Sequence, residues 1–358
     1  MWGSKSNDPS RGSWFTYRQR SRSSPRGVLY ASHQVNLRTI YSDYPAHNEL
    51  RSVGHNAMAD FSKYNGVSPE WIALAATLPA LPANQTLEER VVANNAAREE
   101  LARSEMVHLG SRVRLTDHSI PTHDGASVEA RIYQPAETTT PSEAPGPLYI
   151  HLHGGGFLFG TLSSEDAICS RIVLNTGVQV LNVNYRHSPA AKYPTAWDDA
   201  EDALCWVHAN AASLGVDPAR IVIGGISAGA QITSSLVLRR HLGQGRAKDL
   251  PPVAGQVLMI PCLVNIDSYA SQLAKLKDPK SSSYVENKDA PLLPVAMIRL
   301  FTDMLINSEA DPSDLRISPG NASLEEVKGL PPTVFGVAGM DPLRDEALLW
   351  AELLTEAK

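Results

Sequence analysis

The chain has 358 residues, of which 43% are apolar and 20% charged, and its formal net charge is −6. This length suits about two domains, or one large α/β domain with an insertion. The apolar share can fill a complete core, which excludes wholesale disorder, collagen-like repeats and mini-proteins. Residues 1–40 have a net charge of +6, which leaves −12 on the other 318 residues. Because an acidic body does not suit the phosphate backbone, no nucleic-acid partner is expected.

The N-terminal segment, residues 1–45, is basic and rich in Ser and Arg. It lacks an apolar run of the about 7–15 residues that a secretory signal needs. Its composition is similar to that of a mitochondrial transit peptide, but a disordered tail is the interpretation that we favour. We therefore expect a cytoplasmic protein, with mitochondrial import as the alternative.

The cysteines and the apolar runs further limit the class of protein and its compartment. The three cysteines, Cys169, Cys205 and Cys262, are too few and scattered for a disulfide framework or a zinc site, and they suit a reducing compartment. The longest apolar stretch, 71–83, is too short to span a bilayer, so no membrane span is expected.

The first predicted elements are helices. Ser68, Pro69 and Glu70 offer an N-cap, a first-turn proline and a first-turn acid. A capping box at 86–89 starts a long polar helix that is expected to end near Ser104. Together these helices occupy residues 46–105.

Strand signals begin at residue 113. Residues 113–135 alternate around an Asp-Gly turn, which predicts a pair of strands. From residue 148 onward, apolar β-rich runs alternate with helices predicted over 196–210 and 342–356; the runs are 148–152, 178–184, 220–224, 256–261 and 333–337. Buried strands separated by helices predict an α/β core over 106–358, built on a mostly parallel, doubly wound sheet.

One segment has the pattern of a nucleophile elbow, G-x-S-x-G, at residues 225–229. It follows a predicted strand and precedes a predicted helix, as a sharp strand-to-helix turn requires. Gly225 and Gly229 meet the need for small residues on both sides, because larger side chains would collide across the turn. The hydroxyl of Ser227 is then lifted out of the sheet, and the N–H of Ala228 faces developing negative charge.

A glycine-rich loop, His153-Gly154-Gly155-Gly156-Phe157, ends the strand predicted over 148–152. Consecutive glycines leave backbone N–H groups uncovered, which an oxyanion hole requires. We expect His153 to anchor this loop rather than to carry protons.

An aspartate, Asp341, follows the strand predicted over 333–337. A parallel sheet presents its site at the carboxyl ends of its strands. Asp341 is therefore placed to orient an imidazole and to balance its charge.

These elements, in this order, resemble the hormone-sensitive-lipase-like branch of the α/β-hydrolases. The resemblance covers roughly residues 50–358 and includes further matching segments at Asn184-Tyr185-Arg186, Tyr193-Pro194, Asp289-Ala290-Pro291-Leu292 and 341–346. It implies an α/β-hydrolase fold with a helical cap, formed by residues near 50–105 and an insertion near 265–310.

The resemblance also implies an activity and its residues. The protein is expected to cleave small-molecule carboxylic esters through an acyl-enzyme, without cofactor or metal. Ser227 would be the nucleophile, Asp341 the triad acid, and the N–H groups of Gly154, Gly155 and Ala228 the oxyanion hole. The oligomeric state, the acyl group and the alcohol cannot be read from the sequence.

This sequence departs from the family pattern at three points. Ile226 stands where the family usually has Asp, and Ala190 stands where it has Glu. The family's catalytic histidine follows the triad aspartate by some 30 residues, whereas the printed chain ends at Lys358 and has no histidine after His241. We therefore expect a chain shortened before the last strand, the last helix and the histidine.

Two alternatives to an ordinary esterase stay open. One is a ligand-binding pseudo-hydrolase, which keeps the fold but lacks a working triad. The other is a hydrolase of secondary metabolism that acts on a lactone or a thioester.

Overall fold

A computed structural model describes residues 58–77, 85–136, 144–308 and 310–358. The predicted basic segment, residues 1–45, lies outside the described residues, as does part of the apolar stretch 71–83.

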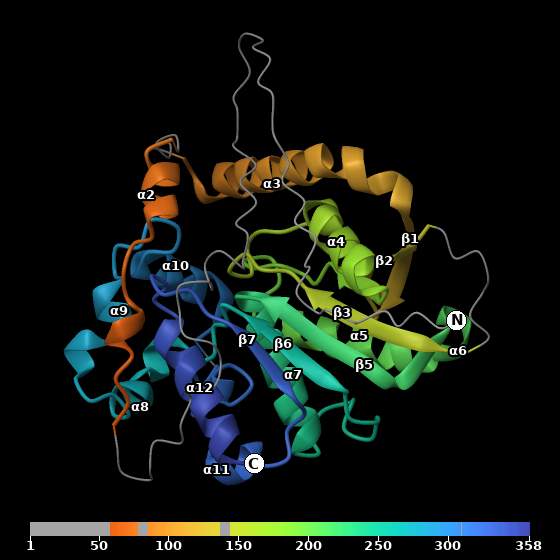
Figure 1. The fold of residues 1–358 in the computed structure, drawn as a ribbon. Coiled ribbons are helices and arrows are strands. Elements are labelled where there is room, and N and C mark those ends of the chain that lie inside the picture. The colour runs from red at the N-terminus through yellow and green to blue at the C-terminus, as the bar shows by residue number, and fades with distance from the viewer. Residues whose placement is uncertain (1–57, 78–84, 137–143, 309) are drawn as a thin grey trace, which may run out of the picture. The chain divides into compact units, whose positions relative to one another are not determined.

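In these ranges seven strands form one sheet, in the order β1-β2-β4-β3-β5-β6-β7 (Figure 1). The strands are β1 (Val113–Pro121), β2 (Ser127–Pro135), β3 (Gly146–Leu152), β4 (Gln179–Val183), β5 (Val216–Ile226), β6 (Gly255–Met259) and β7 (Thr333–Gly336). The five strands from β4 to β7 in this order are parallel, whereas β1 and β2 pair antiparallel with their neighbours. The mostly parallel sheet is therefore confirmed.

Helices connect and flank these strands. The α-helices are α2 (Pro69–Ala75), α3 (Leu87–Leu109), α4 (Asp166–Thr176), α5 (Thr195–Ala209), α6 (Ala211–Leu214), α7 (Ala228–His241), α8 (Ala270–Leu273), α9 (Ser283–Glu286), α10 (Val295–Leu305), α11 (Leu324–Val327) and α12 (Arg344–Glu356). The 3₁₀ turns are η1 (Ser62–Tyr64), η2 (Gly110–Arg112), η3 (Ser163–Glu165), η4 (Ile266–Ser268), η5 (Pro279–Ser281) and η6 (Pro319–Asn321). No described helix is long and apolar enough to cross a membrane.

The predicted helix starts are confirmed. The Ser68 side chain accepts a hydrogen bond from the N–H of Trp71 at the start of α2. Thr86 and Glu89 form a reciprocal capping box at the start of α3. The predicted end of this helix near Ser104 was too early, because nothing between Ser104 and Leu109 interrupts its hydrogen bonds.

The centre of the sheet is formed by β3 and β5. The side chains of Leu148, Ile150, Leu152, Ile221 and Ile223 are fully buried there. A parallel strand covered on both faces has this pattern of continuous apolar residues. The helix α7 packs against β3, β5 and β6, so the polypeptide that leaves β5 turns sharply back over the sheet.

The segments expected to form the cap contact each other. Ala59 pairs in a parallel β-bridge with Leu276, and Phe61 joins both residues and Leu349 in one apolar cluster. The first described residues are thereby tied to the segment near 265–310 and to α12. β7 is the edge strand of the sheet in the described residues, and Val334 is 61% exposed.

Candidate active site

Ser227 occupies a strained turn between β5 and α7. Its φ of 53° and ψ of −112° lie outside the regions that L-residues normally adopt. The backbone N–H of Ser227 donates to the carbonyl of Met259, at the end of β6, over 2.8 Å. The turn begins later than predicted, because β5 does not end at Gly224 but continues to Ile226.

The two glycines of the turn have no room for side chains. A Cβ on Gly225 would lie 2.4 Å from the carbonyl carbon of Gly229, and a Cβ on Gly229 would lie 2.0 Å from the carbonyl oxygen of Leu152. Backbone atoms are not displaced cheaply, so both positions require glycine. The turn can therefore form only because glycine stands two positions before and two positions after Ser227.

The glycine-rich loop leaves β3 and lies directly against this turn. A Cβ on Gly154 would lie 2.9 Å from the carbonyl oxygen of Ile226. Gly155 has φ +141°, and a Cβ there would lie 2.1 Å from the carbonyl oxygen of Phe159. On Gly156 a Cβ would meet the ring of Phe301, which comes from α10. The loop and the serine turn therefore lie side by side.

Backbone donors at this junction have no protein partner in the described part of the chain. Gly154 and Gly155 donate no hydrogen bond from their N–H groups there. Ala228 is the first residue of α7, where a helix leaves its N–H groups without an intrahelical acceptor. These groups are available to a negatively charged atom beside Ser227.

His153 lies beneath the loop and is fully buried. Its Nδ1 donates to the carbonyl of Gly154 over 3.1 Å, so its Nε2 can accept from the Nε2 of His187 at 3.3 Å. Burial lowers the pKa of His153 to about 3 and that of His187 to about 4, so both rings are neutral at pH 7. Neutral rings with both nitrogens engaged suit an anchoring role.

Asp341 lies in the loop after β7. Its carboxylate accepts one hydrogen bond from the N–H of Leu343, over 2.9 Å. Burial raises the pKa of Asp341 to about 6, and this hydrogen bond opposes the shift. A buried carboxylate with a single backbone donor would gain from a cationic partner.

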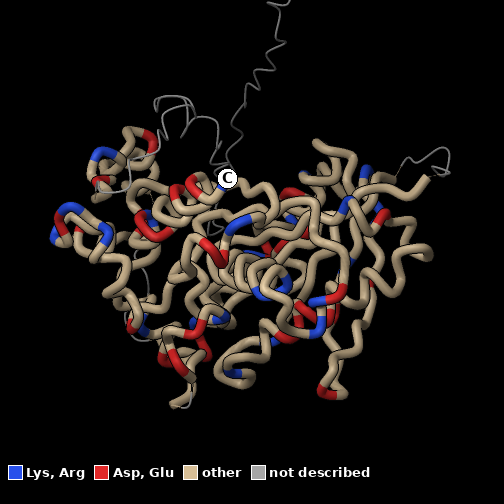
Figure 2. The backbone as a smooth tube through the Cα atoms, turned by 90° about the horizontal axis from the view of Figure 1, so that it is seen from below, with Lys and Arg blue, Asp and Glu red and all other residues tan. Residues whose placement is uncertain are grey.

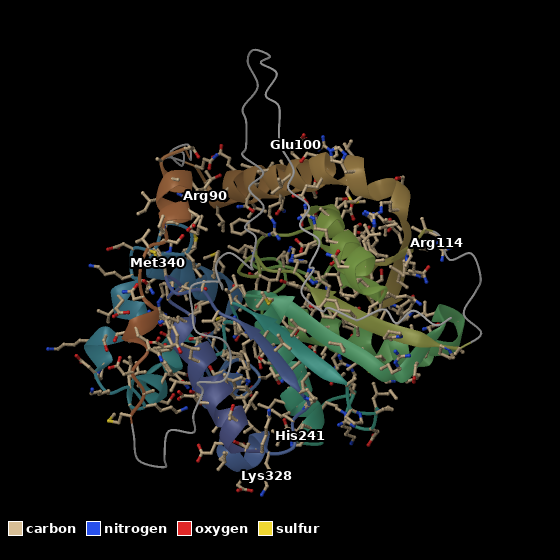
Figure 3. The ribbon with its side chains drawn as sticks, in the orientation of Figure 1. Arg90, Glu100, Arg114, His241, Lys328 and Met340 are labelled. Carbon is tan, nitrogen blue, oxygen red and sulfur yellow. The ribbon has the colours of Figure 1, made fainter. Side chains whose placement is uncertain are left out.

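In the described residues no histidine is hydrogen-bonded to Ser227 or to Asp341. His241 ends α7, which begins next to Ser227, and a helix of this length spans about 20 Å. Figure 3 shows His241 well apart from Met340, the residue before Asp341. The nearest histidine along the chain is therefore not placed to serve the serine.

Several residues at this site were not predicted from the sequence. Arg98 and Asn95 of α3 bond to the segment after β3, and Glu165 of η3 pairs with Arg98. The sequence marks α3 only as a polar helix. The spacing of three between Asn95 and Arg98 indicates that both lie on the same side of the helix. It does not indicate which segment packs against that side.

The described residues offer no group of three or more His, Cys, Asp or Glu side chains that could hold a metal ion. Figure 2 shows acidic and basic positions interspersed along the described backbone. The candidate site residues thus comprise a serine hydroxyl, the backbone donors beside it and one buried carboxylate in the loop after β7.

Comparison with known proteins agrees with this geometry. A family model described as the α/β-hydrolase fold matches residues 149–358. Esterase LipI of Mycobacterium tuberculosis is 32% identical over 289 residues, which cover 79% of this chain and 81% of LipI. Carboxylesterase NlhH of the same species is 37% identical over 217 residues, 59% of this chain and 61% of NlhH.

A solved structure supports the same assignment. The crystal structure of vibralactone cyclase superposes with a TM-score of 0.72 at 27% identity, over 84% of this chain and 86% of that one. The fold, the order of the motifs and these likenesses agree, and the chain belongs to the α/β-hydrolase fold family.

Proposed function

We propose that the protein hydrolyses carboxylic esters of small molecules through an acyl-enzyme on Ser227. The observation that carries this proposal is the contact between the strained serine turn and a loop whose N–H groups are unpaired. The relatives named esterase and carboxylesterase support the substrate class.

In the proposed reaction the Ser227 hydroxyl oxygen attacks the ester carbonyl carbon while its proton passes to a base. The carbonyl oxygen becomes negative, and the N–H groups of Gly154, Gly155 and Ala228 stabilise it; each such donor is worth roughly 10²–10³ in turnover. The alcohol leaves with a proton. Water then attacks the acyl group, which releases the acid and restores the hydroxyl.

The base is the open part of the proposal. The family resemblance assigns it to a histidine that follows the triad aspartate, and Asp341 would orient that ring. No histidine of the described residues is hydrogen-bonded to Ser227 or to Asp341. Removing the histidine of such a triad costs about 10⁶ in turnover, so a non-catalytic, ligand-binding role is the alternative that an assay must distinguish.

Turnover of p-nitrophenyl acetate and butyrate provides that assay. We expect the chain to release more than one equivalent of p-nitrophenol, and the Ser227→Ala variant to release none above background. Ser213→Ala, an exposed serine in α6, is the matched control and should behave as the unaltered chain. Binding of an ester without release by either protein would favour the pseudo-hydrolase.

The likeness to vibralactone cyclase favours a second candidate, acyl transfer with a lactone or a thioester as substrate. The same serine and the same backbone donors would serve it. Preferential turnover of a β-lactone over p-nitrophenyl butyrate would support this candidate.

The division of the chain and its location remain proposals as well. We propose cap helices over 46–105 and 265–310 on a core over 106–358, with the tail 1–45 outside both. All three cysteines are unpaired, which suits a reducing compartment; we propose the cytoplasm, with mitochondrial import as the alternative.

A further inference from the structure

One face of α3 holds the segment that follows β3. Asn95 accepts from the N–H of Gly160 over 2.9 Å, and Arg98 donates from Nη1 to the carbonyl of Gly154 over 3.0 Å. Residues separated by three positions lie on the same side of a helix. In Figure 1, α3 is the long helix at the upper edge, and its contacts with the loop reach across 56 or more residues of sequence.

The guanidinium of Arg98 is itself fixed in place. Its Nη2 pairs with Oε1 of Glu165 over 2.7 Å, and Oε2 of Glu165 accepts from Nε2 of His151 over 2.9 Å. Glu165 is buried, with 3% of its surface exposed. Burial alone would raise the pKa of Glu165, but its partners His151 and Arg98 lower this pKa to about 2. The counterion of Arg98 is therefore a permanent, buried charge.

The carbonyl that Arg98 binds belongs to the peptide group that supplies the proposed oxyanion donor. In a trans peptide the C=O and the following N–H point in opposite directions. The Gly154–Gly155 bond is not among the cis peptides of the described chain, which are Ser188–Pro189 and Tyr193–Pro194. A cation on the carbonyl of Gly154 therefore directs the N–H of Gly155 away from α3 and polarises it.

Gly154 lies beside the serine turn. A Cβ on Gly154 would lie 2.9 Å from the carbonyl oxygen of Ile226, the residue before Ser227. His153 also donates to this carbonyl, so the oxygen accepts two hydrogen bonds, whereas the N–H of Gly155 has no acceptor among the described residues. The peptide is held by its carbonyl, and its N–H stays free for a ligand.

We propose that Arg98, held by Glu165, is a positioning residue of the oxyanion hole: it orients and polarises the Gly154–Gly155 peptide from the cap helix α3. The inference rests on the proposed function, since it concerns the same oxyanion. Arg98 does not touch the substrate. Its loss should weaken stabilisation of the transition state more than binding of the ground state.

Kinetics of Arg98→Met test this directly. Met keeps much of the apolar stem but removes the charge and the donors. We expect kcat for p-nitrophenyl butyrate to fall by roughly 10- to 100-fold, somewhat less than for a deleted oxyanion donor, with KM changed by less than about threefold. Arg103→Met on the same helix is the control, because within the described ranges Arg103 forms only an exposed pair with Glu100, and its loss should leave both constants unchanged.

A second readout separates positioning from mere support of the fold. In Arg98→Ala, added methylguanidinium should restore part of kcat, because the site is partly exposed and Glu165 still attracts a cation. Arg98→Lys should retain an intermediate kcat, since a point charge cannot bind Glu165 and the carbonyl in one fixed fork. If kcat of Arg98→Ala falls only in proportion to the folded fraction of the protein, and methylguanidinium does not restore it, the inference is overturned.

The contact can also be tested without turnover. Among all residues of the chain, only Gly155, Gly156 and Gly225 are preceded by glycine. Protein made with glycine labelled at both the carbonyl carbon and the nitrogen therefore gives three carbonyl-filtered amide signals. Arg98→Met should shift one of them towards weaker hydrogen bonding, and Arg103→Met none. Three unmoved signals would overturn the inference, whereas turnover by Ser227→Ala would instead overturn the proposed function.

Discussion

A side chain at Gly225 should break the serine turn through steric collision alone. The Cβ of Gly225→Ala would lie 2.4 Å from the carbonyl carbon of Gly229, 2.5 Å from its oxygen and 2.6 Å from the oxygen of Leu152. All three are backbone atoms, so no rotamer change relieves the contact. Overpacking typically costs 1–3 kcal/mol, and we expect a loss of about 3 kcal/mol or more in the free energy of unfolding.

The control for this variant is Gly177→Ala. Gly177 caps α4 with φ +74°, and nothing lies within 4 Å of the Cβ it would gain. This substitution has only the cost of a left-handed backbone, about 1 kcal/mol, because no collision is added. Gly225 does not have a positive φ, so the two variants separate collision from backbone strain.

Urea unfolding measures the free energy of unfolding of each variant. Labelling by a fluorophosphonate probe shows whether the serine turn is intact. Gly225→Ala should lose labelling in the fraction that remains folded, and Gly177→Ala should keep it. If Gly225→Ala unfolds within about 1 kcal/mol of the unaltered chain and labels equally, the turn is not sterically closed and our reasoning is wrong.

Three further predictions follow from the same contacts. Gly155→Val should lower kcat by at least the roughly 10²–10³ of one oxyanion donor, because its Cβ also meets the carbonyl of Phe159; unchanged steady-state kinetics would place the hole elsewhere. The folded-state pKa of Asp341 is raised to about 6, so the folded chain binds this proton more tightly and loses stability as pH rises from about 4 to about 6. Above pH 6, the free energy of unfolding of Asp341→Asn should therefore exceed that of the unaltered chain by on the order of 3 kcal/mol, whereas at pH 4 the two should be equal. Urea unfolding at both pH values measures this difference, and a difference that does not change with pH would contradict the prediction. The edge strand β7 exposes Val334, so the chain should self-associate and Val334→Lys should reduce this in light scattering; a monodisperse unaltered chain would refute it.

Local features of the site could be predicted from the sequence because their causes are local. The turn around Ser227 needs small residues two positions before and after it, and Gly225 and Gly229 stand in those places. The capping box at the start of α3 involves only Thr86 and Glu89. In both cases the residues that carry the pattern are at most four positions apart, although the serine turn also packs against the carbonyl of Leu152, which the pattern does not reveal.

Long-range features could not be predicted in this way. The bond from Arg98 to Gly154 joins residues 56 positions apart, and it exists only because α3 packs against α4 and η3. The burial of Glu165, which keeps Arg98 oriented, likewise depends on tertiary packing. The end of α3 was misplaced because the sequence has no stop signal at Ser104.

The most direct test of the account is the site of covalent modification. The chain would be treated with a fluorophosphonate probe, digested, and the adduct located by mass spectrometry. We expect a single adduct on the peptide that contains Ser227. Protein that is denatured before it meets the probe should carry no adduct. An adduct on a different serine, or on none while p-nitrophenyl esters are turned over, would contradict Ser227 as the nucleophile.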